Sequence, residues 1–215
     1  MPQTKLILVR HGETDDNKNL VFQGQEGRGL NERGREQAAL LAARFTAAQI
    51  RAAAIYTSDL DRARETAAIV GGALGLEPRL DPDLREVFLG AWQGLSQAQV
   101  EARFPDEWAA WTRGDDLARG GGESYAALGD RLSRAIGRIS EAHPVSTVVV
   151  VSHGAAIKTF VARVLGLGTP GLRTYRAAHN TGVCVVERGP DGVHRLLVWN
   201  DASHLGDAVA EAVRG

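Results

Sequence analysis

The sequence predicts a single-domain, three-layer α/β/α fold, in which helices cover both faces of a mostly parallel sheet with an antiparallel edge strand. Strand-like apolar runs alternate with helix-like stretches along the 215 residues, a length that suits one domain. The runs at 5–9 and 147–151 are apolar almost throughout, as expected of strands buried on both faces. The runs at 183–187 and 195–198 flank a turn at 189–192, which favours an antiparallel pair at one edge.

Each element follows from a local signal, in chain order. Short, bounded apolar runs predict strands at 5–9, 53–56, 147–151, 183–187 and 195–198, with a short extended piece at 77–80. Apolar residues at helical spacing predict helices at 32–47, 60–74, 96–103, 106–112, 124–143 and 155–165. Asn31 can cap the first helix, and Gly75 ends the second. Pro105 separates the third helix from the fourth, and the long helix stops before Pro144.

Residues 84–123 carry the weakest secondary-structure signals. The stretch 84–94 fits neither period, and 113–123 is rich in Gly and Asp, which predicts a mobile loop. We interpret 95–123 as an insertion over one end of the sheet. Trp108 and Trp111 lie three residues apart on a short helix. They either pack that helix onto the domain or form an apolar wall for a ligand.

Composition excludes several classes of protein. The formal net charge of −1 gives no overall basic field, so we expect neither nucleic acid nor an anionic membrane as partner. Cys184 is the only cysteine, which excludes an intramolecular disulfide and predicts a cytoplasmic location. No apolar stretch approaches the roughly 20 residues of a membrane span. The six histidines show no zinc-ligand spacing, so no metal is expected. Apolar groups on the later strands, or in the tail at 209–213, are candidates for a homodimer interface.

Three predicted strand ends carry unusual groups. The first strand ends in Arg10-His11-Gly12, the second is followed within about a turn by Arg62, and the 147–151 strand ends in Ser152-His153-Gly154. Ligands bind beyond the carboxyl ends of strands in open parallel sheets. Guanidinium groups match phosphate oxygens in pairs. A neutral imidazole is a nucleophile toward phosphorus when a hydrogen bond occupies its other nitrogen. The pattern therefore predicts phosphoryl transfer.

The leaving alcohol of such a reaction needs a proton. Glu86, in Leu84-Arg85-Glu86, is the best candidate donor, since a nearby phosphate dianion favours a protonated carboxyl group. We expect His11→Ala to abolish turnover and to leave the fold intact, because a surface-facing imidazole contributes little packing. Cys184 lies in an apolar run and is expected in the core.

The motifs on these loops resemble those of the histidine phosphatase, or phosphoglycerate mutase-like, superfamily. The resemblance begins at Arg10-His11-Gly12-Glu13-Thr14 and covers nearly the whole chain in the same order. It continues through Asn17, Gln23-Gly24, Leu30-Asn31-Glu32-Arg33-Gly34, Ser58-Asp59-Leu60-Asp61-Arg62-Ala63, Leu84-Arg85-Glu86, Gly122-Glu123-Ser124 and Ser152-His153-Gly154.

The resemblance implies a role for each matching residue. It makes His11 the residue that is transiently phosphorylated and Glu86 the proton donor that later serves as base for water. The residues that it implies bind the phosphoryl group are Arg10, Arg62 and the catalytic His153, with further contacts from Asn17 and Gln23. The family works without a metal or another cofactor, and its sheet is mostly parallel with an antiparallel edge strand.

The segment after Glu86 favours the phosphatase branch over the mutases. It contains the Gly-x-Trp-x-Gly pattern of that branch at residues 90–94, where mutases have a Tyr-Gly segment and a longer insertion. The implied activity is metal-independent hydrolysis of small phosphate esters through a phosphohistidine. The alternatives are phosphoryl transfer of the mutase type and, more remotely, a non-catalytic phosphate-binding module. Phe22, Phe88 and Trp92 are the expected substrate-pocket residues. The sequence does not distinguish among glucosyl-3-phosphoglycerate, phosphoserine and α-ribazole phosphate as substrates.

Overall fold

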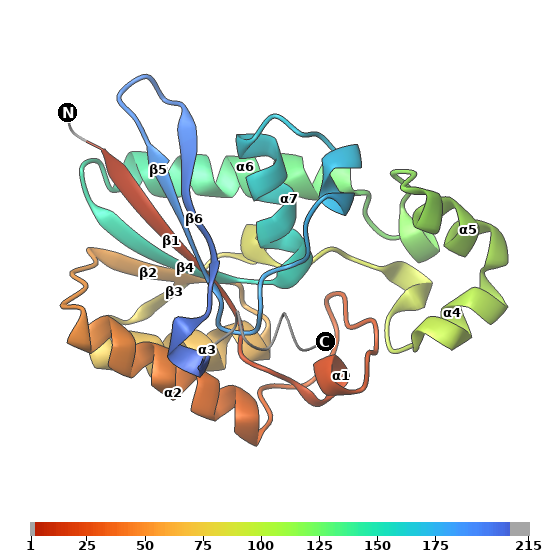
Figure 1. Cartoon of the computed structure of the whole chain (residues 1–215), viewed down its shortest axis with the longest axis horizontal. Coiled ribbons are helices and arrows are strands. Elements are labelled where there is room, and N and C mark those ends of the chain that lie inside the picture. The colour runs from red at the N-terminus through yellow and green to blue at the C-terminus, as the bar shows by residue number, and fades with distance from the viewer. Residues whose placement is uncertain (1–2, 207–215) are drawn as a thin grey trace.

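The computed structural model describes residues 3–206, which form a six-stranded sheet between two layers of helices (Figure 1). The strands follow the order β3-β2-β4-β1-β5-β6 across the sheet. They are β1 (Thr4–Arg10), β2 (Ala54–Thr57), β3 (Pro78–Leu80), β4 (Thr147–Ser152), β5 (Val183–Arg188) and β6 (His194–Asp201). The first four strands in that order run parallel, whereas β5 is antiparallel to both β1 and β6. The predicted α/β fold with an antiparallel edge is confirmed.

Helices cover both faces of this sheet. Helices α2 (Glu32–Ala47) and α3 (Asp61–Leu74) pack on one face, and α6 (Tyr125–Ala142) and α7 (Gly154–Val164) pack on the other. The layers arise because successive side chains of a strand point to opposite faces. On β1, Ile7 and Val9 join the core beneath α2 and α3, whereas Leu6 and Leu8 join the core beneath α6 and α7.

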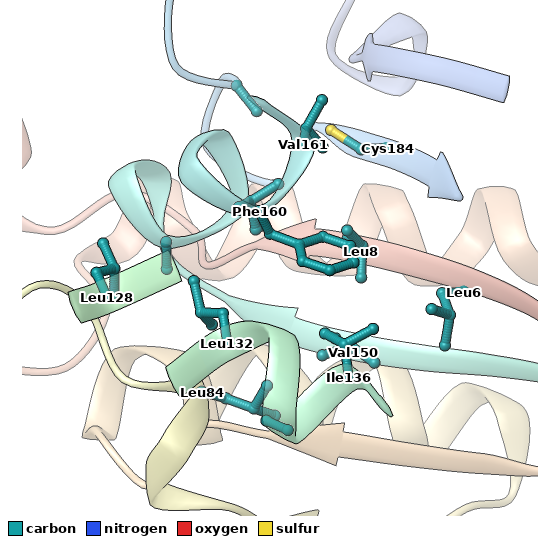
Figure 2. Close-up of a cluster of buried hydrophobic side chains, with 14 of the residues drawn as sticks. Leu6, Leu8, Leu84, Leu128, Leu132, Ile136, Val150, Phe160, Val161 and Cys184 are labelled. Atoms are coloured by element: carbon teal, nitrogen blue, oxygen red, sulfur yellow. The ribbon is translucent and has the colours of Figure 1, made fainter. Parts of the chain in front are cut away.

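The core between the sheet, α6 and α7 is the larger of the two. Figure 2 shows Leu8 and Val150 of the sheet facing Leu132 and Ile136 of α6 and Phe160 of α7. All five side chains are at most 4% exposed. Each such side chain contributes about 1.5–3 kcal/mol when it is fully buried. Cys184 is also fully buried in this core, as expected.

The predicted helix boundaries are close to those observed. Asn31 caps α2 by accepting a hydrogen bond from the Gly34 N–H at 2.8 Å. Gly75 ends α3 in the left-handed region, with φ of +68°. Ser124 caps α6 through the Ala127 N–H at 3.1 Å. Asn31 and Gly75, which predicted where α2 begins and where α3 ends, therefore form those two helix ends.

The structure differs from expectation mainly between β3 and α6. The extended piece at 77–80 is an edge strand of the sheet, because β3 pairs with β2. Two helices meet at Pro105, as expected: α4 (Gln97–Arg103) ends before Phe104, and Pro105 is the first residue of α5 (Pro105–Arg113). The expected mobile loop at 113–123 contains a 3₁₀ turn that is tied to α5 by a Gly120 N–H donating to Glu107 Oε2 at 2.7 Å.

Helices α4 and α5 lie beside one end of the sheet, apart from the two helical layers (Figure 1). The short helix α1 (Asp15–Lys18) lies at this end as well. None of the helices within residues 3–206 is long and apolar enough to cross a membrane. The tail at 209–213 lies outside the described residues. On the later strands, Leu197 and Val198 of β6 are exposed.

Candidate active site

Three loops meet at the carboxyl ends of β1, β2 and β4. Strands β1 and β4 are parallel neighbours, with Arg10 in register with Ser152. His11 and His153 therefore leave the sheet side by side, and their ring centroids lie 5.1 Å apart. Strand β2 is the other neighbour of β4, and Arg62 stands in the first turn of α3 that follows it. The fold therefore brings together, at the carboxyl ends of these strands, the residues that the sequence pattern indicated.

The His11 imidazole is oriented by its own loop. Its Nδ1 lies 2.7 Å from the Gly12 carbonyl oxygen, which can only accept, so Nδ1 carries the proton and Nε2 keeps a lone pair. Burial, then Arg62 and Arg10, hold the pKa of His11 well below its usual value. The ring is therefore neutral at pH 7. It is only 2% exposed, so our expectation of a surface-facing imidazole is wrong.

Both arginines present unused N–H groups at the same place. Arg62 donates from Nη1 to the Glu26 carbonyl at 2.7 Å and from Nη2 to the Gly24 carbonyl at 2.6 Å. Arg10 donates from Nη1 to the Ala178 carbonyl at 2.8 Å. The Nε of each arginine is buried and has no partner among the described residues. Burial lowers the pKa of Arg62 to about 10, which leaves it charged at neutral pH.

His153 adds two further unsatisfied atoms. The side chain is fully buried, and neither ring nitrogen has a hydrogen-bond partner within residues 3–206. Burial is the main cause that holds the pKa of His153 well below its usual value, with Arg62 the next. Buried polar atoms without partners are rare in native proteins. Their concentration around His11 fits a site that an anion would complete.

Glu86 lies in the segment between β3 and α4, and its carboxyl group is bound at the N-terminus of α7. Its Oε1 accepts from the N–H of Val87 at 2.9 Å and of Ala156 at 3.0 Å, and its Oε2 accepts from the Ala155 N–H at 3.0 Å. These bonds hold the carboxyl group against the first turn of α7, next to His153 and Gly154. Burial lowers the pKa of Arg10 and of Arg62, and the nearby Glu86 carboxylate partly offsets this effect at both guanidinium groups.

Three residues that the sequence analysis missed position this group. Thr66 accepts from the Gly12 N–H at 3.0 Å and donates to the Arg62 carbonyl at 2.8 Å, so it links the His11 loop to α3. Asn180 donates from Nδ2 to the His11 carbonyl at 3.0 Å. Arg131 donates to the Glu86 carbonyl at 3.2 Å. Only Thr66 had a local signal, since a residue four places after Arg62 shares its helix face.

Asn17 and Gln23 lie in the loop beside His11, with several of their polar atoms already bonded to protein. Asn17 Oδ1 accepts from Asn180 Nδ2 at 3.1 Å, and Asn17 Nδ2 donates to Gln23 Oε1 at 3.3 Å. Gln23 Nε2 donates to Thr14 Oγ1 at 2.8 Å. In this structure the two amides therefore hold the loop together.

The expected pocket residues have three different positions. Phe88 is 41% exposed, and Phe22 is half-buried. Trp92 does not line a pocket: it has no exposed surface, and its ring packs against Phe22, with centroids 5.6 Å apart, and against Trp111, with centroids 5.9 Å apart. The 84–94 stretch has no regular period, so its sequence did not reveal that Trp92 points inward.

The tryptophans of α5 extend this aromatic cluster. The centroids of Trp108 and Trp92 lie 6.2 Å apart, and those of Trp108 and Trp111 lie 5.0 Å apart. The cluster packs α5 onto the domain, as one of the two interpretations had it. Within residues 3–206, no three His, Cys, Asp or Glu side chains converge in an arrangement that could hold a metal ion.

Comparisons with known proteins agree with this geometry. The sequence profile of the histidine phosphatase superfamily (branch 1) matches residues 6–202. The chain is 37% identical over 204 residues to phosphoglycerate mutase-like protein 4 of Arabidopsis thaliana, which covers 94% of this chain and 86% of that protein. It is 34% identical over 205 residues to the metal-independent phosphoserine phosphatase of Arabidopsis thaliana, which covers 94% and 83% respectively.

A solved structure is similar as well. A mycobacterial glucosyl-3-phosphoglycerate phosphatase in complex with VO3 superposes with a TM-score of 0.82 at 33% identity, covering 91% of this chain and 98% of that chain.

Proposed function

We propose that His11 is the residue that receives the phosphoryl group, because the chain belongs to the histidine phosphatase superfamily (branch 1) and is a phosphoric monoester hydrolase. The observation that carries this assignment is the hydrogen bond from His11 Nδ1 to the Gly12 carbonyl. It leaves Nε2 as the nucleophile. His153 lies beside it, and the nearby charges of Arg62 and Arg10, after burial, lower the pKa of His11.

The reaction follows in two displacements. In the first, the lone pair of His11 Nε2 forms a bond to phosphorus, the ester P–O bond breaks, and Glu86 gives its proton to the leaving alcohol. In the second, Glu86 takes a proton from water, whose oxygen displaces phosphate from the histidine. The free enzyme is restored with Glu86 protonated for the next turnover. Arg10, Arg62 and His153 stabilise the negative charge on the equatorial oxygens in both steps.

Two features support the role of Glu86. It is anchored by three backbone N–H groups, so its carboxyl group has a fixed position relative to His11. The Arg131 guanidinium, which is itself paired with Glu123 at 2.7 Å, holds the Glu86 carbonyl. A general acid acts only within hydrogen-bond reach of the leaving oxygen, so this double anchoring is what the step requires.

We also infer that residues 95–123 are an insertion that borders the leaving-group side of the site. The contact that supports this inference is Trp111 of α5 packed edge-on against Phe22, with centroids 5.9 Å apart. Phe22 lies directly before Gln23 of the loop that Arg62 holds.

The test is phosphate release by EDTA-treated protein from a panel of esters that includes p-nitrophenyl phosphate, phosphoserine, 3-phosphoglycerate and glucosyl-3-phosphoglycerate. His11→Ala should abolish release, whereas His143→Ala, a histidine outside the site, should retain it. A denaturing quench during turnover should trap one phosphoryl group on His11. Release that persists in His11→Ala would overturn the mechanism. Accumulation of an isomerised ester in place of phosphate would identify a mutase.

A further inference from the structure

A cavity of about 550 Å³ lies next to the phosphate site. It is bordered by α5, by the start of α6, by α7 and by the segment that precedes β5. Ala177 of that segment connects it to the catalytic residues: a Cβ built on Gly154 would lie 3.6 Å from Ala177 Cβ and 3.3 Å from Arg10 Nε. Lys158, one turn of α7 beyond Gly154, also lines the cavity. Four residues of helix span about 6 Å, so the cavity begins about one turn from the phosphate site.

The charge of the cavity is positive. Lys158, Arg173 and Arg176 line it, together with the single carboxylate of Asp115. Asp115 already pairs with Arg113 at 2.9 Å, and Arg173 donates to the Thr112 carbonyl. In the described part of the chain, Lys158 and Arg176 have neither an ion pair nor a side-chain hydrogen bond. Burial lowers the pKa of Lys158, with no carboxylate to offset it. Neither cation is therefore paired with a carboxylate within residues 3–206, although the Lys158 Nζ lies 5.4 Å from the centroid of the Tyr175 ring.

The walls of the cavity are aromatic and held in place. Tyr175 donates its hydroxyl proton to the Lys158 carbonyl at 2.7 Å. Tyr125 accepts from Arg119 Nη1 at 3.1 Å, and the guanidinium carbon of Arg119 lies 4.2 Å from its ring centroid. Trp111, the third ring, is fixed by Trp92 behind it. One face of Tyr125 therefore carries the Arg119 guanidinium, and one face of Tyr175 carries the Lys158 ammonium, 5.4 Å from its ring centroid. Rings held in this way form fixed apolar walls beside those charges.

The volume of the cavity indicates a leaving alcohol with more than three carbon atoms. Pockets of about 300–1,000 Å³ hold ligands of drug size, mostly against apolar and aromatic walls with a few polar groups that fix orientation. This cavity has both kinds of group, and Ala177 on its border lies beside Gly154, next to Arg10 of the phosphate site.

We propose that this cavity binds the leaving group of the substrate, and that this leaving group combines a ring with an anionic group that Lys158 and Arg176 bind. The inference rests on the proposed phosphatase function and adds the chemical class of the alcohol. The aromatic faces select the ring, and the two cations select the charge. Phosphate esters of neutral or cationic alcohols of similar acidity would phosphorylate His11 more slowly, because they lack an anionic group for Lys158 and Arg176 to bind.

The experiment compares 4-carboxyphenyl phosphate with its neutral counterpart, 4-(hydroxymethyl)phenyl phosphate. The wild-type enzyme should prefer the carboxylate ester by roughly tenfold or more in kcat/KM, the scale of a hydrogen bond to a charged group. Lys158→Gln and Arg176→Gln should each reduce this ratio several-fold. The ratio cancels any general loss of activity in a variant. Arg134→Gln, an exposed arginine on α6, is the matched control and should leave the ratio unchanged.

Binding separates this inference from the catalytic proposal. Calorimetry with 4-hydroxybenzoate, the alcohol product, should give a lower Kd for the wild type than for Lys158→Gln, and 4-hydroxybenzyl alcohol should bind both weakly. If both esters are hydrolysed by a His11-dependent route at equal kcat/KM, and the two products bind equally, the inference is wrong while the proposed function stands. If no ester is hydrolysed yet 4-hydroxybenzoate binds through Lys158, the cavity assignment stands and the catalytic proposal fails.

Discussion

The phosphate end of the site and the adjoining cavity are built in different ways. At the phosphate end, His11 and His153 come directly from neighbouring central strands, and Arg62 from the first turn of a helix. These side chains are buried, and backbone carbonyls fix the orientation of His11 and Arg62. The cavity is formed by side chains on α5, α6 and α7 and on the segment before β5. Groups on rigid elements keep the precise geometry that chemistry needs. We propose that selectivity lies in the cavity, where a substitution leaves the sheet undisturbed.

The largest effect should come from the phosphate end. We expect Arg62→Gln to lower kcat/KM by about 10²–10³ for every ester, because it removes a fixed donor that stabilises transition-state charge. It also removes the bonds to the Gly24 and Glu26 carbonyls that hold the neighbouring loop. Steady-state kinetics with two esters of different size would measure the loss. The control is Arg64→Gln on the same helix, an exposed residue paired with Asp61. A loss confined to one ester would mean that Arg62 contacts the leaving group.

The second prediction concerns acid stability, to which the phosphate end should contribute. Burial also lowers the pKa of His204, to about 4, so His204 adds to the same loss. The pKa values of His11 and His153 are held well below the usual value, so the unfolded chain binds protons that the native state does not. Stability is therefore complete above about pH 6.5 and falls as the pH drops below it. Each buried ring should contribute a loss of up to about 2 kcal/mol between pH 7 and 5. Lys158 should contribute nothing in this range, since an ammonium with a lowered pKa still remains charged there.

Urea unfolding at a series of pH values would measure this loss. His153→Gln removes one titrating ring and should reduce the slope of unfolding free energy against pH below 6.5. The slope is the readout because the substitution also changes absolute stability. A free energy of unfolding that is constant between pH 7 and 5 would show that the two rings are not the buried, neutral groups described above.

The smallest effect should come from the cavity. We expect Trp111→Ala to lower kcat/KM for phenyl phosphate esters several-fold relative to phosphoserine, since it removes one aromatic wall, a contact worth about 0.5–1.5 kcal/mol. A competition assay with both substrates in one reaction would give the ratio directly. Trp108→Ala is the matched control, because Trp108 packs in the same cluster but is not among the residues that line the cavity. Equal ratios in the two variants would assign the effect to loosening of α5.

Most of the phosphate end could be predicted from the sequence because its signals are local. A buried strand followed by Arg-His-Gly or Ser-His-Gly fixes both the position and the direction of those groups. Trp92 shows the opposite case. Its direction depends on a 3₁₀ turn at residues 90–92, and a stretch without a regular period does not encode which side faces the core. The burial of His11 was missed because it depends on packing between distant segments. The first turn of α2 lies so close to the His11 loop that a Cβ on Gly12 would be 2.4 Å from the Gly34 carbonyl oxygen.

The positioning roles of Thr66 and Asn180 could not be predicted from the spacing of residues in the sequence. Each acts through a hydrogen bond to a backbone group that is distant in the sequence, at Gly12 and at His11. Such bonds depend on the final packing of α3 and of the β5 approach against the first loop. Many polar residues have the same local context without forming such a contact.

The central position of β1 has a consequence for how the molecule is made. The strand that carries His11 is the first to be synthesised, yet its two neighbours in the sheet, β4 and β5, are near the other end of the chain. At about 5–20 residues per second, translation leaves β1 without either partner for roughly 10–30 s. A nascent chain therefore lacks the complete proposed phosphate site until His153 and Asn180 have left the ribosome. A fragment that ends before β4 lacks the strand that sets His11 beside His153, so it should be inactive until the missing segment is supplied as a separate polypeptide.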